Sequence, residues 1–292
     1  MIIGDNKGAV IQNMKEAVQR EAYNDKVEVD DPNLSAEEKS EIINHYLQNY
    51  RTLGYKICNW LARCVIDTVT KTENRSTQVR GLDNLTGITD GAIVTSNHFN
   101  PLDNTVVRCA VKKAGYKRLY IVSQETNLAM KGIVGFLMNH ADIIPLTNSK
   151  KYLETYFPPL LQKILSKKGL ILIYPEQEMW FNYRKPRPPK RGAYYYAAQN
   201  YVPVISCFVE IRDTSEKETA QFYKTEQIIH ILEPIYPDRS LSVRENSKIM
   251  MAADYRQKVA AYEQAYGKKL NYDFEESDIA GWIPNGGSLE GK

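Results

Sequence analysis

GAIVTSNHFNPLDNTVVRCAVKKAG, residues 91–115, contains a strand, a loop and a helix in direct succession. The run Ala92–Ser96 is short, largely apolar and rich in β-branched residues, which is typical of a strand buried in a sheet. Residues 101–114 carry apolar side chains at helical spacing. Pro101 suits the first position of that helix, so we expect Asp103 at the third position. A strand that leads directly into a helix is the repeating unit of an α/β fold.

The same alternation continues along the chain to about residue 266. Further β-rich runs lie at residues 78–80, 119–122, 143–146, 170–174, 202–209 and 227–232. Further helical patterns lie at residues 127–140, 149–168, 192–200 and 242–266. We therefore expect an α/β fold with a central, mostly parallel or mixed sheet that is flanked by helices.

An amphipathic helical pattern precedes this region. Ser35 and Glu38 form a capping box, and apolar residues then recur at steps of three and four, with a break near Gly54. We expect an N-terminal helical segment at residues 1–72, an α/β domain at 73–270 and a loosely ordered tail at 271–292. The helical segment either packs on the core or lies with its Tyr, Trp and Arg side chains in a membrane interface.

Bulk properties exclude several classes of protein. The net charge of +3 over 292 residues gives no strong field for nucleic acid, so we expect no nucleic-acid partner. No stretch reaches the ~18 apolar residues of a membrane span, so any membrane contact should be peripheral. The four cysteines show no zinc-ligand spacing, and the first residues lack the apolar core of a signal peptide. We expect a cytoplasmic protein without metal or cofactor, at the inner face of the membrane.

His98 and Asp103 are the candidate catalytic residues. On one continuous helix, five residues would turn their side chains about 140° apart, but a loop allows the imidazole to fold back onto the carboxylate. A histidine oriented by a carboxylate can act as a general base, and open α/β sheets have their sites at this end of a strand. Asp103 has an alternative role, because an acidic residue in the first turn favours the helix dipole.

A second unusual segment is a basic run that follows Tyr174-Pro175-Glu176. Its cations are Arg184, Lys185, Arg187, Lys190 and Arg191. The run either forms a solvated, proline-rich loop or holds phosphate groups, which guanidinium side chains grip through paired hydrogen bonds. The neighbouring Trp180, Phe181 and Tyr183 either enter a membrane interface or line the active-site cleft.

Taken in order, four segments resemble the glycerophosphate and lysophosphatidate O-acyltransferase family. Asn97, His98 and Asp103 match its N-H-x-x-x-x-D motif, and Tyr174-Pro175-Glu176 matches part of F-P-E-G-T-R. The two later matches are Lys190 with Gly192-Ala193, and Val202-Pro203-Val204-Ile205. The resemblance covers roughly residues 75–235.

The resemblance implies a lipid-metabolic enzyme of phospholipid biosynthesis. Acyl-CoA or acyl-carrier protein would donate a fatty acyl group to the hydroxyl of a lysophospholipid or related lipid. His98 would remove the hydroxyl proton, Asp103 would orient His98, and Glu176 would help to bind the acceptor.

The sequence also departs from the family's pattern. Asn148 and Met179 stand where two phosphate-binding arginines are expected, and Gln124 stands where a lysine is frequent. Either the basic run replaces those arginines, or the acceptor is a glycolipid or sugar hydroxyl. A further alternative is a catalytically inactive, lipid-binding relative. The sequence does not define the oligomeric state.

Overall fold

The computed structural model describes residues 6–29, 32 and 34–284. Its centre is a seven-stranded sheet with the strand order β1-β7-β6-β2-β5-β3-β4. The strands are β1 (Gln78–Arg80), β2 (Ala92–Thr95), β3 (Leu119–Gln124), β4 (Ile143–Leu146), β5 (Leu170–Ile173), β6 (Val204–Lys217) and β7 (Tyr223–Ile231). Only β6 and β7 pair in antiparallel fashion, and the other neighbours in this sheet are parallel. The expected mixed, mostly parallel α/β sheet is confirmed.

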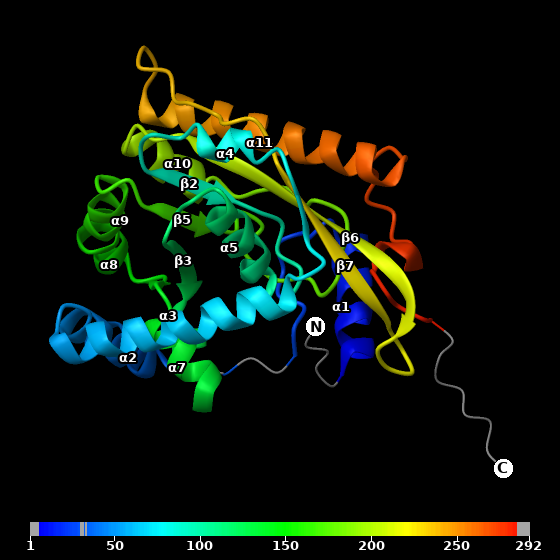
Figure 1. Ribbon diagram of the computed structural model, residues 1–292, viewed down its shortest axis with the longest axis horizontal. Coiled ribbons are helices and arrows are strands. Elements are labelled where there is room, and N and C mark those ends of the chain that lie inside the picture. The colour runs from blue at the N-terminus through cyan, green and yellow to red at the C-terminus, as the bar shows by residue number, and fades with distance from the viewer. Residues whose placement is uncertain (1–5, 30–31, 33, 285–292) are drawn as a thin grey trace.

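Helices cover both faces of the sheet (Figure 1). Those described are α1 (Lys7–Gln19), α2 (Ala36–Asn49), α3 (Leu53–Glu73), α4 (Asp83–Thr86), α5 (Asp103–Lys113), α6 (Glu125–Leu128), α7 (Gly132–His140), α8 (Lys150–Thr155), α9 (Phe157–Leu165), α10 (Gly192–Gln199) and α11 (Val243–Tyr266), followed by a 3-10 turn at Glu276–Asp278. None of these helices is long and apolar enough to cross a membrane.

Strand β2 shows why the sheet is buried on both sides. Alternate side chains of a strand point to opposite faces, and both faces of β2 carry apolar residues. Val94 packs in one core with Val107 of α5, whereas Ile93 packs in the other with Leu161 of α9 and Tyr194 of α10. The chain that leaves β2 is therefore fixed between two hydrophobic layers.

A buried polar network also anchors the end of β2. Asp254 of α11 is fully buried and accepts hydrogen bonds from Thr95 (2.7 Å) and from the hydroxyl of Tyr194. Lys258 completes the network with an ion pair of 2.8 Å to Asp254 and a hydrogen bond of 3.0 Å to Thr95. Because the carboxylate is paired and hydrogen-bonded, its burial beneath the β2 end is tolerated.

Three helix boundaries differ from those expected. The helix after β2 begins at Asp103, not at Pro101, because residues 101–102 form a turn that Asn100 closes by accepting the Leu102 amide. The pattern at 149–168 forms two helices, α8 and α9, because prolines lack the amide hydrogen that continues a helix. The pattern at 127–140 forms α6 and α7, separated by residues 129–131, and α7 begins at Gly132, which has φ 65°.

The N-terminal helices occupy two separate places. The expected capping box of Ser35 and Glu38 is present and opens α2. Helices α2 and α3 lie along one edge of the domain, where α3 packs on α7 through Ala62 and Ile66 (Figure 1). Helix α1 instead packs elsewhere, in a core with Trp180.

Part of the tail expected from residue 271 packs on the domain. Ile279 and Ala280 are buried, and Ile279 forms a bridge with Tyr183. Apolar contact with the α1 core holds this segment in place. The last eight predicted tail residues, 285–292, lie outside the described residues.

Candidate active site

His98 lies in the loop after β2 and contacts Asp103 at the start of α5. Its Nδ1 is 2.7 Å from Oδ2 of Asp103, so the loop brings the two predicted residues together. A carboxylate can only accept, so Nδ1 carries the proton and Nε2 keeps its lone pair in the neutral ring. The His98 side chain is 22% exposed, and within the described chain no group bonds to Nε2. The nitrogen that can take up a proton is therefore free.

Asp103 is almost fully buried and is held by four hydrogen bonds. Oδ2 accepts from His98 and from the backbone amides of Phe99 (2.9 Å) and Asn100 (3.3 Å). Oδ1 accepts from the hydroxyl of Tyr174 at 2.6 Å. These four donors fix the position of the Asp103 carboxylate beside the imidazole.

Tyr174 follows β5 and completes the group around His98. Its ring stacks on the imidazole with a centroid separation of 4.0 Å and an angle of 14°. Burial and the neighbouring Asp103 carboxylate raise the pKa of the Tyr174 hydroxyl well above its usual value. Tyr174 therefore stays a neutral hydrogen-bond donor to Asp103 and also fixes the plane of the ring.

Asn97 fixes the start of the loop. Backbone pairing between β2 and β6 ends at Thr95, but the Asn97 side chain continues it. Its amide donates to the carbonyl of Val209 at 3.1 Å and accepts from the amide of the same residue at 2.8 Å. A side chain that imitates a strand neighbour sets the direction in which His98 leaves the sheet.

Glu176 is buried beneath the His98 loop. Its Oε2 accepts from the His98 amide at 3.2 Å, and its Oε1 accepts from the Arg187 amide at 2.9 Å. The Arg187 guanidinium forms an ion pair with Glu176 at 2.9 Å, and both side chains are at most 4% exposed. The structure therefore places Glu176 behind the site and occupies both of its oxygens.

Arg187 also bonds to three backbone carbonyls. It donates to Tyr23 at 2.9 Å, to His98 at 3.4 Å and to Glu178. Burial lowers the pKa of its guanidinium, and the Glu176 carboxylate opposes that shift. Most of its donors are thus bonded within the protein, and its role in substrate binding stays a prediction.

Two other members of the basic run are likewise paired within the protein. Lys185 forms an ion pair of 2.7 Å with Asp278, and each side chain is 1% exposed. Arg184 pairs with Asp213 and donates to the Ser277 carbonyl at 2.8 Å. These partners come from β6 and from the C-terminal segment, so Lys185 and Arg184 hold the tail in place. Both cations already have carboxylate partners, and their role in substrate binding stays a prediction.

Lys190 and Arg191 remain exposed at the start of α10. The Lys190 amide donates to the Pro175 carbonyl at 2.7 Å, which places this end of the run next to Glu176. The run is thus neither a solvated loop throughout nor one phosphate-binding cluster. Its two exposed cations are the members that can meet a ligand.

The aromatic residues before the run are buried. Trp180 and Phe181 are fully buried, and Tyr183 is 2% exposed, in the core that contains α1. Neither expected role, in a membrane interface or as a cleft wall, is met. The sequence pattern of aromatic and cationic residues reflects a small core closed by paired charges.

The expected departures from the family pattern lie close to the site. Gln124, at the end of β3, donates to the Glu178 side chain at 2.9 Å. Glu178 thus adds an acidic group where the family's motif carries Gly-Thr-Arg. Among the described residues, no group of three or more His, Cys, Asp and Glu side chains is placed to hold a metal ion.

The geometry places a histidine–carboxylate pair, suited to general-base chemistry, at the carboxyl end of a buried parallel strand. A protein-family model described as Acyltransferase matches residues 68–210, which include β2, His98, Asp103, Tyr174 and Glu176. This similarity to the acyltransferase family spans just under half of the chain and supports an acyltransferase. The resemblance inferred from the motifs is confirmed at this level.

One solved structure similar to this chain is the 1-acyl-sn-glycerophosphate (LPA) acyltransferase PlsC from Thermotoga maritima. It is 14% identical, with a TM-score of 0.49, over 89% of this chain and 99% of that one. No match was found among curated proteins.

Sequence reasoning missed Tyr174 and Asn97 as parts of the group that positions His98 and Asp103. For Tyr174 a signal was present, because a hydroxyl stands where the F-P-E motif has phenylalanine. For Asn97 the motif itself was the signal, but its bond partner Val209 lies on a strand more than 100 residues away.

Loss of the charge at Arg187 should lower the stability of the fold much more than loss of the charge at Lys190. Arg187→Met leaves Glu176 buried and unpaired, so we expect the free energy of unfolding to fall by about 3–5 kcal/mol. Lys190→Met removes an exposed charge and should change it by less than ~0.5 kcal/mol. Urea denaturation, monitored by circular dichroism, measures the free energy of unfolding of both variants. Equal effects would contradict the structural role of Arg187.

Proposed function

We propose that the protein is an O-acyltransferase that moves a fatty acyl group from acyl-CoA or acyl-carrier protein to a hydroxyl of a lysophospholipid or related lipid. The observation that carries the proposal is the 2.7 Å contact between His98 Nδ1 and Asp103, which leaves Nε2 free to accept a proton. An exposed histidine nitrogen backed by a buried, fully hydrogen-bonded carboxylate is suited to general-base catalysis.

The proposed reaction proceeds in two steps on the thioester. His98 Nε2 takes the acceptor's hydroxyl proton while the hydroxyl oxygen attacks the thioester carbonyl carbon. The tetrahedral intermediate then collapses, the carbon–sulfur bond breaks, and the imidazolium returns the proton to the departing sulfur. Asp103 remains ionised and stabilises the imidazolium formed in between. The acceptor hydroxyl is the nucleophile, so no enzyme nucleophile is required.

Charge around the site favours a second candidate acceptor, a glycolipid or sugar hydroxyl. Arg184, Lys185 and Arg187 are paired internally, which leaves Lys190 and Arg191 for a phosphate. An uncharged acceptor avoids repulsion by Glu178, whereas a phosphorylated acceptor depends on the two exposed cations.

A membrane surface is the proposed source of the acceptor. One face of α3 exposes Leu53 (73%), Ile57 (53%), Trp60 (60%) and Leu61 (44%). The adjoining α7 exposes Ile133 (66%) and Val134 (47%), so the apolar side chains extend over two packed helices. Lys56 and Lys131 are exposed on the same helical pair and suit an anionic bilayer at the inner face of the membrane. We call these six apolar residues the α3–α7 face.

Loss of His98 should abolish transfer. His98→Ala is expected to lower kcat about 10²–10⁴-fold, because the general base is removed. The assay uses purified protein, acyl-CoA or acyl-carrier protein, and a panel of lysophosphatidate, monoacylglycerol and glycolipid acceptors. Transfer that is unaffected by His98→Ala would refute the proposal, and a wild type inactive on every acceptor would favour an inactive lipid-binding relative. The preferred acceptor shows whether phosphate is required.

Tyr174→Phe should lower kcat about tenfold or more while keeping the ring stack. The variant removes one hydrogen bond to the charged Asp103, a contact of about 1.5–3 kcal/mol, and leaves the ring in place. Steady-state kinetics measures the effect, with Tyr195→Phe on the exposed side of α10 as the matched control. An unchanged kcat would show that the hydroxyl is not needed for catalysis.

Membrane binding should depend on the α3–α7 face. The double variant Ile57→Ser/Trp60→Ser is expected to bind anionic liposomes about tenfold or more weakly, since each buried side chain contributes about 1.5–3 kcal/mol. Its matched control is Ile249→Ser/Tyr236→Ser, with 53% and 63% exposure. Ile249 lies on α11, which Figure 1 shows on the opposite side of the molecule from α3. Co-sedimentation measures both variants. Equal losses, or no wild-type binding at low salt, would contradict a membrane role for this face.

A further inference from the structure

A cavity of about 530 Å³ lies at the end of the sheet opposite to His98. Arg118 and Asp142, which line it, directly precede β3 and β4, and Gly169 directly precedes β5. These strands are parallel to β2, whose other end leads to His98. The cavity is therefore separate from the catalytic site, and its volume is within the range of ligand pockets.

The walls of the cavity are aromatic and apolar. Tyrosines from α2, α3 and β3 line one side, and Ile164 and Leu160 of α9 line another. Tyr55 is fixed by a hydrogen bond of 3.0 Å to the Asn139 carbonyl. Tyrosine rings held in place offer flat apolar surface with little loss of side-chain freedom on binding.

The floor of the cavity is a fixed ion cluster. Asp142 has a fully buried side chain and a left-handed backbone at φ 62°. It pairs with Arg118, accepts from Asn59 at 2.9 Å, and has Arg63 at 3.5 Å. One carboxylate thus faces two guanidinium groups, of which Arg118 lines the cavity.

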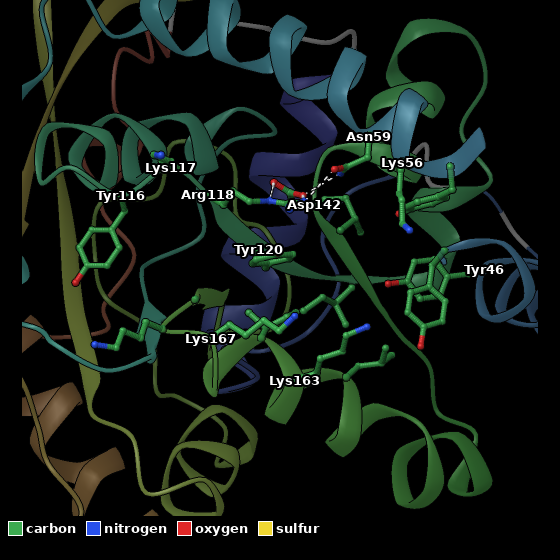
Figure 2. A pocket seen from close by; sticks show the side chains of 18 residues that line it. Tyr46, Lys56, Asn59, Tyr116, Lys117, Arg118, Tyr120, Asp142, Lys163 and Lys167 are labelled. Atoms are coloured by element: carbon green, nitrogen blue, oxygen red, sulfur yellow. Dashed lines mark hydrogen bonds and ion pairs between the residues drawn. The ribbon is translucent and has the colours of Figure 1, made fainter. Parts of the chain in front are cut away.

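The rim is formed by lysines. They are Lys56, Lys117, Lys163, Lys167 and Lys168, and all are exposed. In the part of the chain that the structure describes, none of them forms an ion pair, although Lys163 lies 5.8 Å from the Tyr50 ring centre. Figure 2 shows Lys163 and Lys167 on one side of the space below Tyr120 and Arg118, with Lys56 and Tyr46 on another side. Lysines on an ordinary solvated face do not converge on a hollow with aromatic walls.

We propose that this cavity binds a phosphate group carried on an apolar or aromatic body. The lysines of the rim supply the charge that a phosphate requires, and the tyrosines supply the surface against which the attached body lies. A neutral ligand would leave the lysine cluster without a counter-charge, and a bare phosphate would leave the tyrosine walls unused.

Two sources can supply this chemistry. Lys56 and Asn59 lie on the same helix as Ile57 and Trp60 of the α3–α7 face, so a phospholipid headgroup of a bound membrane can reach the rim. A soluble nucleotide phosphate, with its base against the tyrosines, is the second source. Only the lipid source rests on the proposed membrane docking.

Isothermal titration calorimetry on the full-length protein tests the proposal. The probes are dihexanoyl phosphatidic acid and adenosine 3′,5′-bisphosphate, with dihexanoyl phosphatidylcholine as the probe without net charge, at about 0.15 M salt to suppress diffuse attraction. We expect saturable binding of at least one anionic probe and weaker binding of phosphatidylcholine. Which anionic probe binds identifies the source.

Charge-matched variants separate the cavity from the general positive field. Lys163→Gln/Lys167→Gln should weaken binding about tenfold or more, because two charged contacts are lost. Lys15→Gln/Lys248→Gln removes the same charge from exposed positions on α1 and α11 and should leave binding unchanged. Ile164→Trp fills the hollow without changing charge and should also weaken binding, with circular dichroism to verify its fold.

The proposal is overturned by absence of saturable binding of both anionic probes, by equal binding of phosphatidylcholine, or by equal effects of the two lysine pairs. His98→Ala should bind the probe as the wild type does. This binding measurement requires no catalysis, so its failure is distinguishable from failure of the proposed transfer reaction.

Discussion

The buried ion pair of Glu176 and Arg187 is the interaction on which the site depends. Glu176 accepts the His98 amide, and Arg187 bonds to carbonyls of the loops that contain Tyr23, His98 and Glu178. A buried pair recovers its desolvation cost only when its other polar atoms are also bonded. Here those bonds link the loops after β2 and β5 to the segment after α1. The position of the His98 loop is thus set by the paired and hydrogen-bonded charges of Glu176 and Arg187 beneath it.

The sequence predicted the sheet and the central residue pair well, because both leave local patterns. Buried parallel strands are continuous apolar runs, and these alternate with helices at readable spacing. The contact between His98 and Asp103 could be predicted because Pro101 and the preceding strand indicate a loop between the strand and the helix. The first residue of α5 could not be predicted, because the Asn100 side chain closes a turn just before the helix. The residue at which α5 begins depends on this local hydrogen bond and not on the spacing of apolar residues.

The pairing of the basic run could not be predicted from the sequence, because a run of charged residues does not identify the partners of those residues. Lys185 is neutralised by Asp278, 93 residues further along the chain, and both are buried by the packing of α1 and the tail. Trp180 and Phe181 belong to the same small core, although beside cations they resemble a membrane-facing segment. Residues that resembled ligand-binding or membrane-facing groups in the sequence thus make structural contacts with partners far along the chain. Only Lys190 and Arg191 kept the exposure that the prediction required.

This redistribution of charge bears on how the enzyme selects an acceptor. With three cations paired and Glu178 added, the potential near His98 is less positive than the sequence composition of the run suggests. The unpaired lysines lie instead at the opposite end of the parallel strands, around a different hollow. The lysines that can attract an anion and the His98–Asp103 pair thus lie at opposite ends of one sheet. Selection at the catalytic end must then depend more on shape and apolar contact, which discriminate weakly between similar lipids.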